Sequence, residues 1–176
     1  PVTIAVDIAV ANLRSGRTDL ALAGGVHIFN NIPFLSVFCA LGAMSRGDCI
    51  RPFDKNADGL LPGEGIGIVV LKRQADAERD GNRIYALIRG VGSSSDGRGG
   101  SVSAPRVAGE ALAVQRAYEA AGVPPQTIGL IEAHGTATIV GDTAEVETLK
   151  RVFGARPEGA ARSCALASST PLPTDR

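Results

Sequence analysis

The sequence has little cysteine and little histidine. Its three cysteines, Cys39, Cys49 and Cys164, are odd in number and widely spaced, so a disulfide framework is not expected and a reducing cytoplasm is the expected location. There is no C-x-x-C pair and neither histidine stands close to a cysteine, which argues against a zinc site. The sequence also has no initiating methionine, so we expect a piece of a longer protein.

Net charge and long apolar runs are absent as well. Lysine plus arginine equals aspartate plus glutamate at 18 each, so charge gives no reason to expect a nucleic-acid or membrane-surface partner. No run reaches the roughly 18 apolar residues of a membrane span, and the opening PVTIAVDIAV lacks the basic start and cleavage site of a signal peptide. The 44% of hydrophobic residues is instead typical of one globular domain.

Apolar residues at helical spacing predict three amphipathic helices, over 5–15, 110–121 and 142–153. Gly122 and Pro124 end the second helix. In the third, Asp142 followed by Glu145 has the spacing of a capping box, which predicts that Asp142 caps the helix.

Continuous apolar runs predict strands, and a fourth helix at 34–44 is apolar all round and expected to be buried with Cys39 in it. The strands are predicted at 19–28, 66–73, 83–92 and 127–133. Helices that alternate with such strands favour a layered α/β fold with a mainly buried sheet. Polar connections are predicted over 51–65, 74–82 and 93–105. After residue 154 the apolar residues have no convincing helical or strand periodicity.

Two loops resemble ligand motifs without completing them. Asp54, Asn56 and Asp58 match the start of a calcium loop, but the twelfth position is Gly65, so a tight polar loop with Asx turns is the better interpretation. In GEGIG at 63–67 a strand follows where a phosphate site needs a helix, so close packing of glycines is preferred.

His134, in the stretch EAHGTATIVGD, is the candidate for chemistry. It ends a predicted buried strand, where α/β folds place their ligands. Gly135 leaves space for a ligand to approach the backbone, and Thr136 and Thr138 offer hydroxyl donors. A neutral imidazole there can donate to a developing oxyanion or take a proton. A structural histidine with satisfied hydrogen bonds is the alternative.

Five blocks together resemble the β-ketoacyl synthase family, and most of all the bacterial polyketide synthases. They are DLALAGGVHI, RPFDKNADGLLPGEGIGIVVLKR, IYALIRGVGSSSDG, SVSAP and EAHGTATIVGD, in the family's order, within residues 5–154. The resemblance implies a thiolase-like, layered α/β/α/β/α fold, incomplete, with parts of both halves. Residues 1–75 would end the N-terminal ketosynthase half, 76–155 would start the C-terminal half, and 156–176 form a divergent tail for which disorder is one expectation.

The same resemblance implies the decarboxylative Claisen condensation of acyl and malonyl-type thioesters, carried by an acyl carrier protein, in polyketide or fatty-acid biosynthesis. His134 matches the first of two catalytic histidines. Thr136, Thr138 and Ser103 match hydroxyls near the phosphopantetheine arm of the carrier protein, and no cofactor is bound directly. Asp142 and Glu145 match acidic positions that support the site, where the glutamate normally pairs with a lysine.

The nucleophilic cysteine, that lysine and the second histidine of the family have no counterpart in this sequence. We therefore expect the chain alone to be inactive and marginally stable, with exposed sheet edges and exposed core. Family members are dimers, so a homodimer or heterodimer is implied. Two alternatives stay open: a non-catalytic partner like a chain-length factor, and an inactive truncated product.

Overall fold

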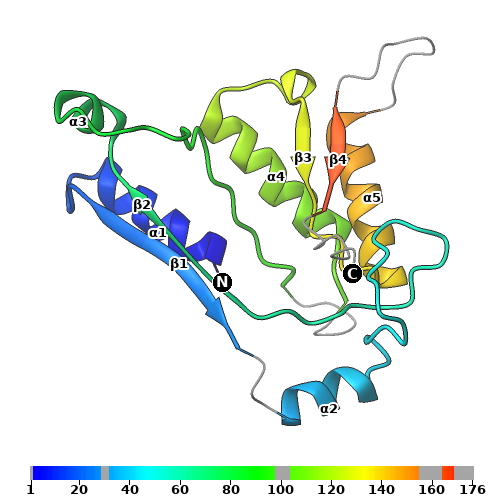
Figure 1. The fold of residues 1–176 in the computed structure, drawn as a ribbon. Helices are drawn as coiled ribbons and strands as arrows, with labels where there is room; N and C mark the ends of the chain where they lie inside the picture. Colours follow the sequence, from blue (N-terminus) through cyan, green and yellow to red (C-terminus); the bar gives the residue numbers. More distant parts are fainter. Residues whose placement is uncertain (1, 29–31, 98–103, 155–163, 169–176) are drawn as a thin grey trace.

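The computed structural model describes residues 2–28, 32–97, 104–154 and 164–168, which form a mixed α/β structure (Figure 1). Its elements, in chain order, are α1 (Val2–Arg14), β1 (Ala21–His27), α2 (Ile32–Ala40), β2 (Gly65–Leu71), α3 (Gln74–Arg79), α4 (Val107–Ala121), the 3₁₀ helix η1 (Pro125–Thr127), β3 (Leu130–Glu132), α5 (Ile139–Phe153) and β4 (Ala165–Ala167). Within these ranges, every helix is too short or too polar to span a bilayer.

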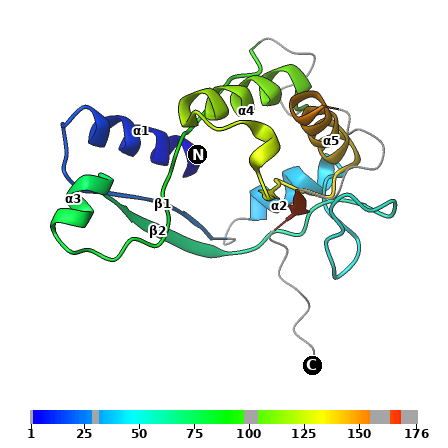
Figure 2. The same cartoon turned by 90° about the horizontal axis from the view of Figure 1, so that it is seen from above.

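The first part of the chain builds a two-stranded sheet with one helix on it. β1 and β2 are antiparallel, with Ala21 opposite Leu71 at one end and His27 opposite Gly65 at the other. Helix α1 lies against one face of this pair, as Figure 2 shows from above. The predicted helix and the two predicted strands are thus confirmed in kind, and Ala9, Leu13 and Ala23 form the buried contact.

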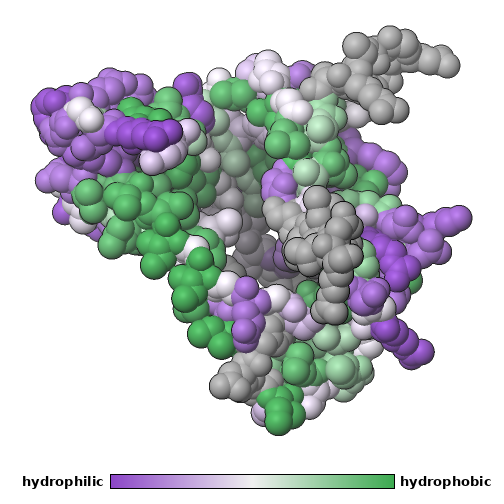
Figure 3. All heavy atoms as spheres, in the orientation of Figure 1, coloured by the Kyte–Doolittle hydropathy of each residue, from purple (hydrophilic) through white to green (hydrophobic). Residues whose placement is uncertain are grey.

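The opposite face of the β1–β2 pair is exposed and apolar. In an antiparallel pair, directly opposed residues point to the same side, so Leu22 with Val70 and Val26 with Ile66 share this face. All four side chains are more than 60% exposed, and apolar surface covers this region in Figure 3. The predicted mainly buried sheet is therefore wrong for these strands, because no described element covers the second face. The expected exposed core is confirmed.

The second part of the chain packs α5 against α4 beside a second, parallel pair of strands. Leu130 of β3 is opposite Ala165 of β4. Tyr118 and Phe153 meet edge to face with ring centroids 5.9 Å apart, and burial raises the pKa of the Tyr118 phenol. β4 lies in the segment after residue 154, where the sequence showed no convincing period.

One further prediction about secondary structure is wrong, and another is incomplete. The apolar run at 83–92 packs against α4, since a Cβ on Gly90 would stand 2.4 Å from the carbonyl oxygen of Ala117. It forms no ladder, because a ladder needs a partner at the edge of the run and none of the described strands pairs with it. The predicted polar connection at 74–82 contains α3, whose six residues are supported by ion pairs of Asp76 with Arg73 and Arg79.

Helix α2 contains no buried residue, contrary to the sequence prediction, and Cys39 is exposed. The helix packs its own aromatic rings together, with Phe34 and Phe38 centroids 4.4 Å apart. A helix that is apolar all round needs neighbours on every side, and the described chain gives it few.

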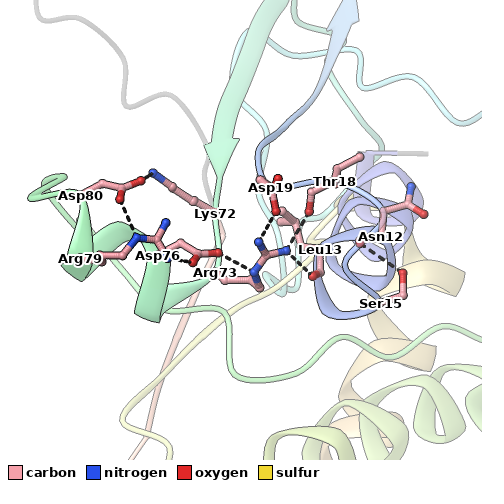
Figure 4. A network of polar contacts seen from close by, with 10 residues as sticks. All are labelled: Asn12, Leu13, Ser15, Thr18, Asp19, Lys72, Arg73, Asp76, Arg79 and Asp80. Carbon is pink, nitrogen blue, oxygen red and sulfur yellow. Dashed lines mark hydrogen bonds and ion pairs between the residues drawn. The ribbon is translucent and has the colours of Figure 1, made fainter.

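Arg73, at the end of β2, ties this strand to the end of α1 (Figure 4). Its guanidinium donates to the carbonyl oxygens of Leu13 at 2.9 Å and Thr18 at 2.8 Å, and it pairs with the carboxylates of Asp19 and Asp76. The hydrogen bond with Asp19 is the first cause of a raised pKa of Arg73. The carbonyl of Leu13 belongs to the last turn of α1, where carbonyls lack the usual partner four residues on, and it also accepts the N–H of Gly16 at 3.2 Å.

Candidate active site

A cavity of about 650 Å³ lies between segments that are far apart in the sequence. One wall is formed by the segment 58–60, and the other by the turn 134–138 with the start of α5. Phe38 of α2 and Leu41, the residue after this helix, add apolar side chains to the lining, and further lining residues are Gly42, Ala43, Asp96, Ala104, Pro105 and Glu110. His134, Thr136 and Thr138 therefore line the same cavity, as the sequence interpretation requires of a shared site.

His134 is held in place through hydrogen bonds at the backbone, and not through its side chain. It follows β3, where the Ala133 N–H still donates to the Ala167 carbonyl at 2.7 Å. The carboxylate of Glu145 then accepts the N–H of His134 at 2.7 Å and that of Gly135 at 2.9 Å. Hydrogen bonds to an ionised acceptor are roughly twice as strong as neutral ones, so the turn is firmly placed while the imidazole stays exposed in the cavity.

Gly135 does not have the role expected from the sequence. Its φ is +50°, and a Cβ there would lie 2.4 Å from the Ser168 hydroxyl oxygen and 3.1 Å from the Cβ of Pro52. The space beside this α-carbon is thus filled by the chain itself, and Gly135 is buried. The glycine permits a close approach between protein segments, and not the approach of a ligand.

Thr136 and Thr138 form a hydroxyl pair at the start of α5. Their Oγ1 atoms are 2.9 Å apart, and the Thr138 hydroxyl accepts the Gly141 N–H at 3.2 Å. Thr138 is therefore the N-cap of a helix that starts at Ile139, three residues earlier than predicted. A Cβ on Gly141 would lie 2.5 Å from the Thr138 hydroxyl oxygen, so only glycine at position 141 leaves room for this hydroxyl.

Asp142 is not the cap that the sequence predicted, and it makes no capping box with Glu145. It is only 7% exposed, and its carboxylate accepts the N–H of Phe53 at 2.6 Å and that of Ala137 at 3.0 Å. Phe53 and Ala137 have φ of 60° and 56°, a left-handed conformation that costs a residue with a Cβ about 1–2 kcal/mol. The sequence carried no signal for these two positions, since neither Phe nor Ala favours this conformation.

The end of the loop opened by RPFD lines the cavity beside this turn. The Asn56 N–H donates to the Asp54 carboxylate at 2.7 Å, the Asx turn predicted for this loop. The Ser45 hydroxyl donates to Asp58 at 2.7 Å and is the first cause of a lowered pKa of that carboxyl group. The next residue, Gly59, donates its N–H to the Ala137 carbonyl at 2.9 Å and so joins the two walls.

Ser103, the third hydroxyl of the predicted site, lies outside the described residues. In the part of the chain that is described, no three histidine, cysteine or acidic side chains gather as metal ligands would. None of Cys39, Cys49 and Cys164 is a lining residue of the cavity, and all three are free thiols.

Two family models match the chain. The one described as "Beta-ketoacyl synthase, N-terminal domain" matches residues 3–77, and the one described as "Beta-ketoacyl synthase, C-terminal domain" matches residues 85–171. A phenolphthiocerol/phthiocerol polyketide synthase protein of Mycobacterium tuberculosis is 40% identical over 171 residues. A polyunsaturated fatty acid synthase protein from Thraustochytrium is 41% identical over 150 residues.

The chain spans only a small part of these relatives. The alignments cover 94% and 85% of this chain, but 9% of the mycobacterial protein and 5% of the Thraustochytrium protein. Among solved structures, the ketosynthase from module 6 of the bacillaene synthase of Bacillus subtilis matches with a TM-score of 0.89 and 34% identity, over 95% of this chain and 30% of that one. The ishigamide ketosynthase/chain length factor matches with a TM-score of 0.85 and 34% identity, over 95% of this chain and 39% of that one.

Proposed function

The chain belongs to the β-ketoacyl synthase family, and we propose that it is the part of a polyketide ketosynthase that contributes one catalytic histidine and one wall of the substrate tunnel. The proposed reaction of the whole enzyme is the decarboxylative Claisen condensation of acyl and malonyl-type thioesters held on an acyl carrier protein. The observation that carries the proposal is the cavity in which an exposed imidazole stands beside two paired hydroxyls.

The residues of the cavity have the chemistry that this reaction needs. An exposed His134 on a turn fixed by Glu145 can hold a hydrogen bond to a thioester carbonyl oxygen as negative charge develops there. A fixed donor needs no reorganisation during the reaction, which is the main benefit of such preorganisation. Glu145 and Asp142 are proposed to support His134 and the turn, and in this chain the oxygens of Glu145 accept from the backbone and not from a lysine.

Phosphopantetheine, the arm on which a carrier protein brings its thioester, fits the character of the lining. The arm carries amide groups along a flexible chain, for which the hydroxyls of Thr136 and Thr138 are suitable partners. Apolar side chains such as Phe38 and Leu60 line part of the remaining cavity, together with the carboxyl groups of Asp58, Asp96 and Glu110. Ser103 is proposed as a third hydroxyl beside the arm.

We further propose that residues 1–75 belong to the N-terminal half of a thiolase-like layered fold and 76–155 to its C-terminal half. The chain alone is expected to be inactive, since none of its three cysteines lines the cavity and the family's second histidine has no counterpart. Loss of one member of a catalytic unit usually removes most of the activity.

A protein related to chain-length factors is the second candidate, because ketosynthase/chain-length-factor proteins are among the similar structures. Such a protein would be the non-catalytic partner in a heterodimer. The exposed imidazole with its paired hydroxyls favours the condensing enzyme, since a partner without chemistry has no need of this arrangement.

The experiment is a titration of the isotope-labelled chain with pantetheine, followed through backbone amide signals. We expect shifts at His134, Thr136 and Thr138, and weaker binding in T136V, which replaces the hydroxyl by a methyl of similar size. T127V is the matched control, because the Thr127 hydroxyl donates to the nearby Pro124 carbonyl outside the cavity.

Two results would contradict the proposal. One is the absence of shifts around the turn at millimolar pantetheine. The other is equal weakening in both threonine variants. A separate incubation with an acyl-pantetheine thioester should leave the mass of the chain unchanged, and an acyl adduct would contradict the expected inactivity.

A further inference from the structure

Asp142 connects the loop that contains Phe53 with the turn that contains Ala137, and both segments contribute residues to the cavity lining. One carboxylate oxygen accepts the N–H of Phe53 at 2.6 Å and the other accepts the N–H of Ala137 at 3.0 Å. Phe53 precedes the wall at 58–60 and Ala137 lies within the turn 134–138. Asp142 itself is not among the residues that line the cavity, so any effect on a ligand passes through these two segments.

The two donors share an unusual backbone conformation. Within the described ranges, Phe53 and Ala137 are the non-glycine residues with positive φ, at 60° and 56°. Strained backbone of this kind persists only where the surrounding structure holds it. One buried carboxylate accepts from both, which makes Asp142 the common support of the two strained positions.

A second contact links the same two segments. The Gly59 N–H donates to the carbonyl oxygen of Ala137 at 2.9 Å, and Ala137 is fully buried. Gly59 is itself fixed, since a Cβ there would lie 2.6 Å from the Ala43 carbonyl oxygen. Ala137 is thus held through its N–H by Asp142 and through its carbonyl by the opposite wall.

We propose that Asp142 is a positioning residue that sets how these two lining segments lie against each other, by holding Phe53 and Ala137 in left-handed conformations. The positioning stands on this geometry alone, and its consequence for a pantetheine ligand rests on the proposed function. Asparagine offers one acceptor oxygen where the carboxylate offers two, so D142N leaves one of the two N–H groups without its partner.

The test is amide hydrogen exchange in D142N. We expect exchange at Phe53 or Ala137 to accelerate by about tenfold or more, while amides in the middle of α4 keep their rates. D54N is the matched control. Asp54 lies in the same loop and accepts one N–H, from Asn56, which asparagine can also accept, so its exchange pattern should stay unchanged.

A second substitution separates positioning from a general loss of stability. Glycine adopts a left-handed φ without steric cost, so in an A137G background residue 137 no longer needs Asp142 to hold its φ, and D142N should lower the urea midpoint by less than it does in the unchanged chain. If D142N alone does not fold, A137G/D142N should fold. Equal losses of midpoint in both backgrounds, no acceleration of exchange in D142N, or a double variant that also fails to fold would overturn the proposal.

Pantetheine titration of the same samples distinguishes this proposal from the proposed function. If the unchanged chain does not bind pantetheine, the proposed function fails, while the exchange data still decide the role of Asp142. If the unchanged chain binds, the dissociation constant should rise about tenfold in D142N and stay constant in D54N. Equal binding by D142N would overturn the link between Asp142 and the cavity.

Discussion

The carboxylate of Glu145 accepts a hydrogen bond from the backbone N–H of His134, and its second oxygen accepts the N–H of the next residue. A residue on a helix thereby fixes the backbone of a turn eleven positions earlier. The imidazole remains free to face the cavity because the backbone alone is used for this anchoring.

E145Q should lower the free energy of unfolding by about 1–3 kcal/mol, because the amide supplies one acceptor for two N–H groups. Urea unfolding followed by circular dichroism measures the change. E147Q is the matched control on the same helix. Glu147 forms an exposed pair with Lys150, so this variant should differ by less than about 0.5 kcal/mol. Equal stability of E145Q and the unchanged chain would contradict the anchoring role.

G135A should destabilise the chain by about 2–4 kcal/mol, because the new methyl group meets Ser168 and Pro52 while φ stays positive. G63A is the control, since nothing lies within 4 Å of a Cβ at Gly63. Urea midpoints of the two variants give the comparison. A midpoint for G135A equal to that of G63A would show that the close approach at Gly135 is absent.

T138A should cost about 1 kcal/mol by removing the N-cap of α5. It should also free the Thr136 hydroxyl from its partner. T143A is the control, because the exposed Thr143 hydroxyl donates to a carbonyl of its own helix, a contact that contributes little to stability. Helical signal and unfolding midpoint measure both effects. The prediction fails if T143A is the more destabilised variant.

Acid should weaken the contact network around Arg73. Hydrogen bonds with Arg79 and Arg73 hold the pKa of Asp76 below its ordinary value, and Lys72 does the same for Asp80. A carboxyl group whose pKa is lowered by folding stabilises the chain above the pKa of the unfolded state, about 3.9. This stability is lost as the pH falls through the lower pKa of the folded state.

Urea midpoints measured from pH 7 down to pH 2 should therefore fall below about pH 4. In D76N the fall should be shallower, because one of the responsible groups no longer titrates. An identical pH profile in D76N would contradict the assignment to Asp76.

Local periodicity predicted most elements but not their environment. The helices α1, α4 and α5 and the strands β1, β2 and β3 were predicted in kind from the order of apolar residues. A helical period does not report which neighbour covers the helix, so α2 was predicted as buried and is exposed. Likewise, a run of apolar residues that predicts a strand does not show which other strand will pair with it, and the run at 83–92 forms no ladder with the described strands.

The site was predicted as a set of residues but not as a set of contacts. Placing His134, Thr136 and Thr138 together required only their order after a strand. The roles of Asp142 and Gly135 could not be read in this way, because their partners Phe53 and Ser168 are distant in the sequence. The capping-box spacing at Asp142 was misleading for the same reason, since Thr138 was a nearer cap and Asp142 had partners elsewhere.

The sequence by itself determined that a histidine and two threonines follow an apolar strand and precede a helix, since these relations depend on residues a few positions apart. Only the tertiary structure decided that the loop at 51–60 lies against this turn and that one buried carboxylate joins them. Hydrogen bonds between distant segments depend on how the chain returns on itself, and no local pattern of residues encodes that return.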